Sequence, residues 1–414
     1  MRSSLVAAVL AMSGVTAPGA PPARVSDVVL AVEGRTNANP SMAAEGAFVA
    51  IAWSASTTTI VDVYASTSRD GGVHWGAPVR VNATPGDARV SGEQPPRVAL
   101  RARAGAAPEV IVVWTSRVSA GSRLLSARST DGGRHFGNSV VVPGAEGAGN
   151  RGWESVAVDT RGRAHVLWLD HREAAMPAGM HHQDGAVPIP DPVEKAGRSQ
   201  LYTSSLDGAG ARSLARGVCY CCKTSLVAAG GALYATWRHV FAGNQRDIGF
   251  AVSRDDGRSW SAPVRVSEDH WAFDGCPENG PAVVVDAAAR VHVLWPTPAD
   301  GANGTPLSLF HAMSRDGVAF TARTPLPVRG PAAHVQGAAT ADGSVLAVWD
   351  EVAKGERRVA VARSTVDAGG RMRFTRVPVH GDAGGRWYPV VAASGETRVL
   401  AWVGATGIGI SRLP

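Results

Sequence analysis

Residues 68–75 read SRDGGVHW, and the same spacing of serine, aspartate, glycine and an aromatic residue recurs later in the chain. STDGGRHF spans 129–136, SRDDGRSW spans 253–260, and a version one residue shorter, SRDGVAF, begins at 314. Serine and aspartate side chains can bond to the backbone of a tight turn, glycine permits positive φ, and the aromatic ring can pack back onto a sheet. The motif therefore predicts a repeated β-hairpin.

A second repeat consists of apolar strands that end in tryptophan. The spacing between successive tryptophans is 61, 54, 69, 58, 54 and 53 residues. The seven tryptophans are Trp53, Trp114, Trp168, Trp237, Trp295, Trp349 and Trp402. A period of this size is typical of solenoids, arrays and propellers. Together with the hairpins and strands such as APVRVN, each period predicts four short antiparallel strands, which is one propeller blade.

These motifs resemble the Asp-box (BNR-repeat) β-propellers of the sialidase superfamily over nearly the whole chain. The resemblance implies that the hairpins join third to fourth strands, away from the functional face, so Asp70, Asp131 and Asp255 are structural. Sialidases have six blades, whereas the tryptophan strands here predict seven, with six as the alternative. Because the last unit lacks room for a fourth strand, residues 25–32 (VSDVVLAV) are expected to close the ring. We therefore expect an all-β fold, a single propeller domain over residues 24–414.

The start of the chain and its composition predict where the protein is located. Residues 1–20 have one early arginine, an apolar run and small residues, which is the pattern of a signal peptide for export to the periplasm or medium. No later run is apolar and long enough to span a membrane. The net charge of +6 comes from scattered arginines, since the chain has three lysines. This argues against nucleic acid as a partner, and we expect a soluble monomer.

Most loops on the expected functional face are short, and the exception is about thirty residues long, from Leu169 to Gln200. Long loops in compact folds are more often functional than not. The next blade begins with GVCYCCKTS (217–225), and the blade after that with a segment containing Cys276. We therefore expect thiols and histidines to gather on blades three to five. The candidate metal ligands are Cys219, Cys221, Cys222, Cys276, His239, His171, His181 and His182.

Three interpretations of the thiols remain open. Exported proteins often carry disulfides. Cys221 and Cys222 are adjacent and cannot easily pair with one another, so a blade-to-blade bridge to Cys276 is the plausible bond. Thiolates and imidazoles also bind copper or zinc, although Cys-x-Cys-Cys is not a zinc-finger spacing. A reactive free thiol is the third interpretation.

The resemblance also implies that the residues of sialidase chemistry should be sought in this chain. Sialidases use an arginine triad, a tyrosine nucleophile with a glutamate partner, and an acid/base aspartate. The candidates are Tyr388 in RWYP, the adjacent Arg386, and Glu154 from another blade, with Asp170 as a further carboxylate. The Arg-Ile-Pro motif of the family is absent, so no arginine is assigned as the first clamp residue.

The sequence thus leads first to a propeller that binds copper or zinc, or another ligand, through a face rich in cysteine and histidine. The alternatives are a glycoside hydrolase of the exo-alpha-sialidase type and a non-catalytic scaffold that binds glycan or protein and carries structural disulfides.

Overall fold

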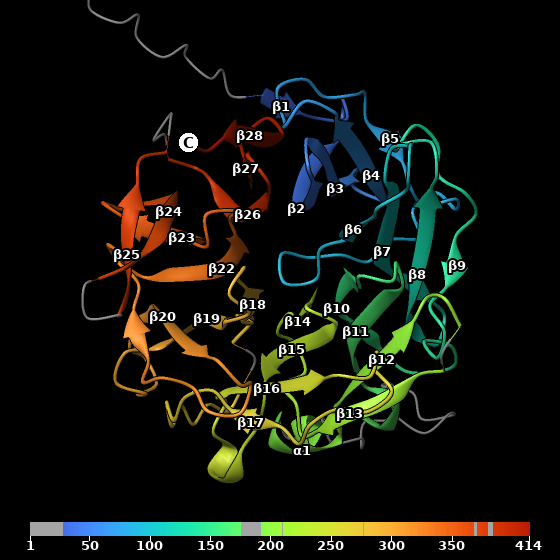
Figure 1. Ribbon diagram of the computed structural model, residues 1–414. Helices are drawn as coiled ribbons and strands as arrows, with labels where there is room; N and C mark the ends of the chain where they lie inside the picture. The colour runs from blue at the N-terminus through green and yellow to red at the C-terminus, as the bar shows by residue number, and fades with distance from the viewer. Residues whose placement is uncertain (1–27, 175–191, 209, 276, 368–370, 380–383) are drawn as a thin grey trace, which may run out of the picture.

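The computed structural model describes residues 28–174, 192–208, 210–275, 277–367, 371–379 and 384–414. Its strands form seven four-stranded antiparallel sheets, arranged as a ring of blades around a central channel (Figure 1). The predicted all-β propeller fold and the count of seven blades are confirmed. Residues 1–27, which include the predicted signal peptide, lie outside the described residues.

In each blade the chain runs outward from the channel, and the first two strands of a blade form its inner half. The first strands are β2 (Thr36–Glu45), β6 (Arg97–Arg101), β10 (Arg151–Val158), β14 (Ser225–Ala229), β18 (Ala282–Val285), β22 (Ala332–Ala339) and β26 (Trp387–Ser394). The second strands are β3 (Phe48–Ser56), β7 (Glu109–Val118), β11 (Ala164–Asp170), β15 (Ala232–Arg238), β19 (Val291–Pro298), β23 (Val345–Ala353) and β27 (Thr397–Val403).

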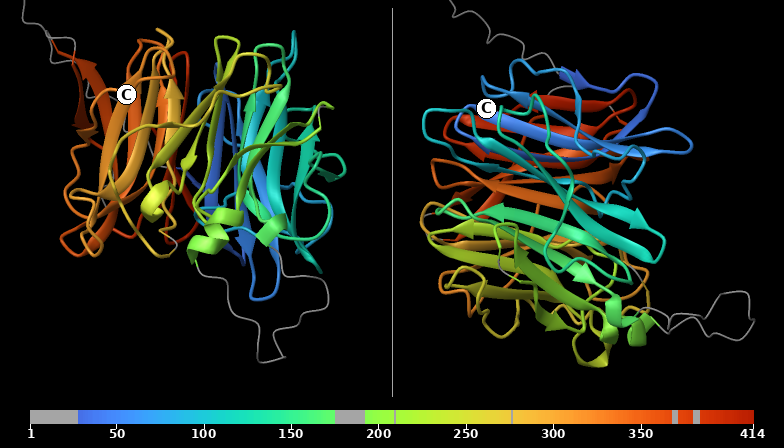
Figure 2. Two further views of the ribbon diagram at one scale, coloured as in Figure 1. Left: turned by 90° about the horizontal axis from the view of Figure 1, so that it is seen from below. Right: turned by 90° about the vertical axis from the view of Figure 1, so that its right-hand side faces the viewer.

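The third and fourth strands form the outer half of each blade. The third strands are β4 (Val61–Ser68), β8 (Gly121–Ser129), β12 (Gln200–Ser205), β16 (Ile248–Ser253), β20 (Leu307–Ser314), β24 (Glu356–Val366) and β28 (Ile408–Arg412). The outermost strands are β5 (Val79–Arg80), β9 (Val140–Val141), β13 (Arg212–Arg216), β17 (Val264–Arg265), β21 (Thr324–Pro325), β25 (Met372–Val377) and β1 (Val28–Leu30). Short helices α1 (Pro192–Arg198), η1 (Arg172–Ala174) and η2 (Ala242–Asn244) lie in loops, and Figure 2 shows α1 at one face of the ring. No helix in the described ranges is long and apolar enough to cross a membrane.

The ring is closed by the N-terminal strand. β1 pairs antiparallel with β28, with Val28 opposite Ile410 and Leu30 opposite Ile408. The seventh blade therefore combines three C-terminal strands with one N-terminal strand, as the sequence predicted. This pairing joins the two ends of the chain in one sheet and leaves the three-residue strand β1 as the outer edge of that blade.

The repeated tryptophans lie in the second strands and are buried, with Trp53, Trp114 and Trp168 fully inaccessible to solvent. Several indole nitrogens donate hydrogen bonds to side chains of their own blade, for example Trp349 Nε1 to Glu351 at 3.0 Å. Each ring also packs against the adjacent third strand. A methyl group on Gly409 would lie 2.5 Å from the indole of Trp402, so only glycine fits there.

The Asp-box hairpins join third to fourth strands, at the positions that the resemblance implied. Ser68 Oγ donates to Asp70 Oδ1 at 2.8 Å and accepts from the Gly72 amide, while Asp70 Oδ1 also accepts from the amides of Val73 and His74. The same bonds recur in the hairpins of Asp131, Asp255 and the shorter motif at Asp316. These carboxylates stabilise turns.

Four first strands share a β-bulge near their start, which the sequence did not reveal. In each bulge the pairing register shifts across a non-glycine residue in the left-handed region, with φ between 50° and 57°. These residues are Asn39, Trp153, His334 and Tyr388. A bulge re-aims the side chain it carries, and such backbone strain is concentrated at functional sites.

We expect Gly409→Ala to lower the free energy of unfolding by about 1–3 kcal/mol, because the added methyl group overpacks the Trp402 indole. The measurement is chemical denaturation followed by far-UV circular dichroism. Gly210→Ala, where a methyl group meets no atom within 4 Å, is the control and should change stability little. Equal losses in both variants would contradict the packing argument.

Candidate functional site

A loop between blades one and two, residues 84–96, crosses the mouth of the central channel; we call it the central loop (Figure 1). Its Glu93 is buried and contacts two distant blades. Glu93 Oε2 accepts from the backbone amides of Lys223 (3.1 Å) and Gly280 (2.8 Å). Glu93 Oε1 lies 3.5 Å from Lys223 Nζ, and both side chains are nearly inaccessible to solvent. The central loop is therefore anchored by a buried ion pair.

A second buried carboxylate, Glu154, lies close to this pair. Glu154 Oε2 accepts from Thr115 Oγ1 at 3.0 Å, and Arg97 Nε donates to the Glu154 carbonyl oxygen. Burial raises the pKa of Glu154 from 4.5 to about 7, although the positive charge of Arg97 opposes the shift. Several buried atoms here have no hydrogen-bond partner among the described residues: Glu93 Oε1, Arg97 Nη2, Glu154 Oε1 and Lys223 Nζ. The channel mouth thus contains a cluster of incompletely satisfied charges.

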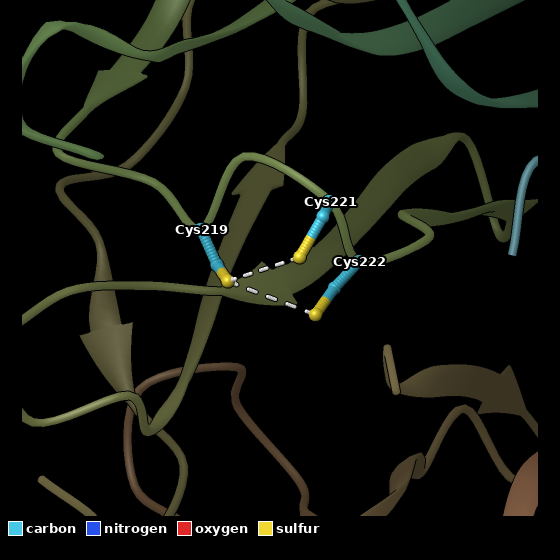
Figure 3. A group of neighbouring side chains, drawn as sticks. All are labelled: Cys219, Cys221 and Cys222. Atoms are coloured by element: carbon cyan, nitrogen blue, oxygen red, sulfur yellow. Dashed lines mark hydrogen bonds between the residues drawn. The ribbon is translucent and has the colours of Figure 1, made fainter. Parts of the chain in front are cut away.

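Three thiols lie beside this cluster, on the connection from β13 to β14. The Cys219 amide bonds to the Arg238 carbonyl at 2.9 Å, and the Thr224 amide bonds to the Trp153 carbonyl, so both ends of the loop are held. Figure 3 shows the three side chains pointing toward one another. Cys219 Sγ lies 3.9 Å from Cys221 Sγ and 3.7 Å from Cys222 Sγ. All three residues are buried.

Two arginines supply positive charge to the thiols. Arg246 Nη1 donates to Cys219 Sγ at 3.4 Å. Arg238, also buried, donates to the carbonyls of Asn279, Pro296 and Arg246. The hydrogen bond from Cys222 lowers the pKa of Cys219 to about 6, and the two arginines act in the same direction. Burial raises the pKa of Cys222.

Two of the three cysteines, Cys219 and Cys222, are free thiols, whereas Cys221 is not a free cysteine in this structure. Cys276, the bridge partner that the sequence suggested, lies outside the described residues, and so do His181 and His182. Their predicted roles therefore stay predictions.

The two described histidines of the predicted metal set do not join the sulfur atoms. The three sulfurs lie within 4.8 Å of one another and form a group without an imidazole. His239 packs between Trp237 and Phe241, and its Nδ1 accepts from Trp237 Nε1 at 3.2 Å. His171 lies against Trp153 in a pocket that also borders Cys221. The backbone brings His239 near the thiol loop, but its side chain points into an aromatic cluster.

Tyr388 lies on the other side of the central loop, in a second pocket. Its ring packs on Gly92, where a methyl group would lie 1.9 Å from Cζ. The ring of His334 is 4.0 Å away, and Asp350 Oδ2 accepts from the Tyr388 amide and from His334. Burial raises the pKa of Tyr388, and the negative charges of Glu93 and Asp350 add to the shift.

The other residues predicted as catalytic are placed elsewhere. Asp170 is buried in ion pairs with Arg172 (2.6 Å) and Arg151 (3.3 Å) and also accepts from Trp168, which indicates a structural role. Arg386 lies over the indole of Trp402 at 4.4 Å. The carboxylate whose charge acts most strongly on Tyr388 is Glu93, whereas the charge of Glu154 acts on Arg97. The structure therefore does not gather Tyr388, Glu154, Asp170 and Arg386 into one site.

The tyrosine pocket has a volume of about 560 Å³. It is lined by Pro277, Glu278, Asn279, His334, Arg357, Trp387 and Tyr388. Arg357 is its lining arginine, and Arg357 Nη1 pairs with Asp350 at 2.6 Å. The described lining therefore lacks the three-arginine clamp that the resemblance implied.

Comparison of the sequence with models of known families and with curated proteins gives no match. Solved structures do match over nearly the full length. A polysaccharide lyase, an ulvan lyase, gives a TM-score of 0.56 at 10% identity and covers 91% of this chain and 93% of its own. An α-L-arabinofuranosidase from Fusarium graminearum gives a TM-score of 0.52 at 11% identity, and the match covers 94% of this chain and 97% of the arabinofuranosidase chain.

A sialidase from Streptococcus pneumoniae matches at a TM-score of 0.48 and 10% identity, and the match covers 93% of this chain and 70% of the sialidase chain. At such identities the matches show the fold alone. The propeller fold is thus confirmed, and the solved structures that share it include a glycoside hydrolase and a lyase. Function has to be argued from the site.

We expect Glu93→Gln to lower the free energy of unfolding by about 3–5 kcal/mol, because it leaves Lys223 buried without a counter-charge. Replacing Lys223 by methionine as well should recover much of the loss. Urea denaturation measures both variants. Glu194→Gln, which breaks an exposed pair with Arg198, is the matched control and should cost less than about 1 kcal/mol.

Glu154 should make stability fall as pH rises. Its pKa is about 7 in the folded protein and 4.5 as its ordinary value, so between these values the folded state binds more protons than the unfolded state. Stability is therefore lost across this window as pH rises. Glu154→Gln cannot ionise, so its stability relative to the parent should increase from pH 4.5 to 7. A difference that is constant with pH would contradict this assignment.

Proposed function

We propose that the protein binds one soft metal ion, Cu(I) or Zn(II), through Cys219, Cys221 and Cys222. The observation that supports this is the spacing of the sulfur atoms, 3.7 and 3.9 Å from Cys219. Metal–sulfur bonds of about 2.3 Å in tetrahedral or trigonal geometry require sulfurs about 3.8–4.0 Å apart. The sulfur atoms therefore need little movement to bind an ion.

The surroundings suit the charge of such a complex. Three thiolates with a monovalent or divalent ion carry a net negative charge, which is costly to bury without compensation. Arg246 contacts Cys219 directly, and Arg238 is held within the electrostatic reach of the same sulfur. Thiolate ligands favour Cu(I) and Zn(II) over harder ions.

The proposal requires Cys221 to be reduced. Cys221 is not a free cysteine in this structure, and its sulfur can act as a thiolate ligand only as a reduced thiol. Metal binding and disulfide formation therefore compete for the same sulfur. Cys276 is the sequence-based candidate for a fourth ligand.

The test is metal titration of fully reduced, metal-free protein under argon, against a chromogenic chelator. The parent should bind one ion per chain, and Cys219→Ser and Cys222→Ser should weaken binding by roughly 100-fold or more. His239→Gln is the control, because His239 packs away from the sulfurs and its loss should leave affinity unchanged. Full stoichiometry in folded Cys219→Ser, verified by circular dichroism, would refute the site.

A second function is supported by the tyrosine pocket: we propose that it binds a carbohydrate. Trp387 and Tyr388 supply aromatic surface, while Glu278, Asn279 and His334 supply polar groups. Three lining residues, Glu278, His334 and Tyr388, have left-handed φ of 48° to 54°, which concentrates backbone strain at this pocket. The two structural neighbours described above are named as enzymes of polysaccharides or arabinofuranosides, which agrees with this ligand class.

Affinity electrophoresis in gels containing polysaccharides tests this second proposal. Trp387→Ala should reduce retardation at least about tenfold, whereas Trp75→Ala, on an Asp-box hairpin, should not. A fluorogenic sialoside tests the exo-sialidase alternative. Cleavage that is lost in Tyr388→Phe would support it, and cleavage at full rate in that variant would exclude Tyr388 as the nucleophile.

A further inference from the structure

A smaller cavity of about 280 Å³ adjoins the thiols on the other side of the central loop from Tyr388. Blades two to four and the central loop contribute its walls; we call it the basic pocket. It is lined by Arg89, Gln94, Ser122, Asn150, Arg151, Trp153, His171, Lys195, Tyr220 and Cys221. Among the described residues the lining includes three cationic side chains and no carboxylate, so its charge favours an anion.

Two of the cations are available to a ligand. Arg151 is committed to Asp170 and to the carbonyls of Gly147, Ala148 and Gly149. Arg89 and Lys195 have no acidic partner in the part of the chain that the structure describes. Arg89 makes a long hydrogen bond to Asn150 Oδ1 at 3.4 Å, and Lys195 Nζ lies 4.2 Å from the centre of the Tyr220 ring.

His171 adds an unsatisfied polar group to the wall of the pocket. Its side chain is 5% exposed, and Nε2 has no hydrogen-bond partner among the described residues. Burial lowers the pKa of His171 to about 4, and the nearby charge of Lys195 adds to the shift. The imidazole is therefore neutral near pH 7. A buried polar atom without a partner is destabilising, and a ligand that bonds to Nε2 would satisfy it.

Aromatic side chains form the rest of the wall. Trp153 is one of the four bulge residues, with φ of 54°, and its indole lies 5.3 Å from the His171 ring. Tyr220 lies across the pocket under Lys195. The volume is slightly below the range for drug-sized ligands, so the ligand is small.

We propose that the basic pocket binds a small organic acid with a flat apolar body. Its carboxylate pairs with Lys195 and Arg89, its body lies against Trp153 and Tyr220, and His171 Nε2 bonds to a polar group of the ligand. Charge-assisted bonds to a carboxylate provide both affinity and orientation. The proposal does not depend on metal binding, although the ligand would lie beside Cys221.

The test compares benzoate with benzamide, which has nearly the same shape and no charge, on metal-free protein by saturation-transfer NMR and equilibrium dialysis. Benzoate should bind, and benzamide should bind at least about tenfold more weakly. Lys195→Gln and Arg89→Gln should each weaken benzoate at least about fivefold. Lys354→Gln is the matched control, because Lys354 lies exposed in the turn between β23 and β24, and it should have no effect.

Equal affinity for benzoate and benzamide, or no response to Lys195→Gln, would overturn the proposal. Binding of inorganic phosphate without any binding of benzoate would refute the proposal that the ligand has a flat apolar body. Cys219→Ser, which removes a proposed metal ligand, should retain benzoate binding. Loss of benzoate binding in that variant, if it is folded, would show that this pocket is not independent of the thiols.

Discussion

The buried pair of Glu93 and Lys223 determines the arrangement of the functional face. Glu93 comes from the loop between blades one and two, and Lys223 follows the three thiols directly. Because the Glu93 carboxylate also accepts the amides of Lys223 and Gly280, it joins the central loop to blades four and five. A charge pair is stable in such a place only when both partners are kept. The central loop is therefore a fixed part of the channel mouth.

This loop separates the two pockets. Gly92 packs on the Tyr388 ring on one side, and Gln94 and Arg89 line the basic pocket on the other. The pockets differ in chemistry as a result. The tyrosine pocket contains a carboxylate and an arginine already paired with Asp350, whereas the basic pocket contains cations that have no acidic partner among the described residues. The two ligands that we propose, a sugar for the tyrosine pocket and a small acid for the basic pocket, follow from this difference in lining.

The Asp boxes and the thiol site lie on different connections of the propeller blades. The Asp-box carboxylates satisfy turn amides between third and fourth strands, and none is available for chemistry. The thiols lie on a connection between a fourth and a first strand, where the chain arrives at the channel. Arg246 and Arg238 come from the neighbouring loop and strand of the same blade, and they provide the positive charge that a cluster of thiolates needs. Fold neighbours that are hydrolases and lyases share the scaffold but do not define this site.

The sequence by itself determined the all-β class, the seven blades, the closure of the ring by an N-terminal strand and the structural role of Asp70, because these depend on local periodicity and turn chemistry. It also placed Cys219, Cys221 and Cys222 together, since they are neighbours in the chain. It did not identify Glu93, Lys223, Arg246 or the bulges at Trp153 and Tyr388, and it grouped Asp170, Arg386 and His239 with sites to which their side chains do not contribute. Those assignments depend on which side chain faces the channel and on contacts between distant blades. A register shift of one residue reverses the face that a side chain occupies, so only the tertiary structure decides them.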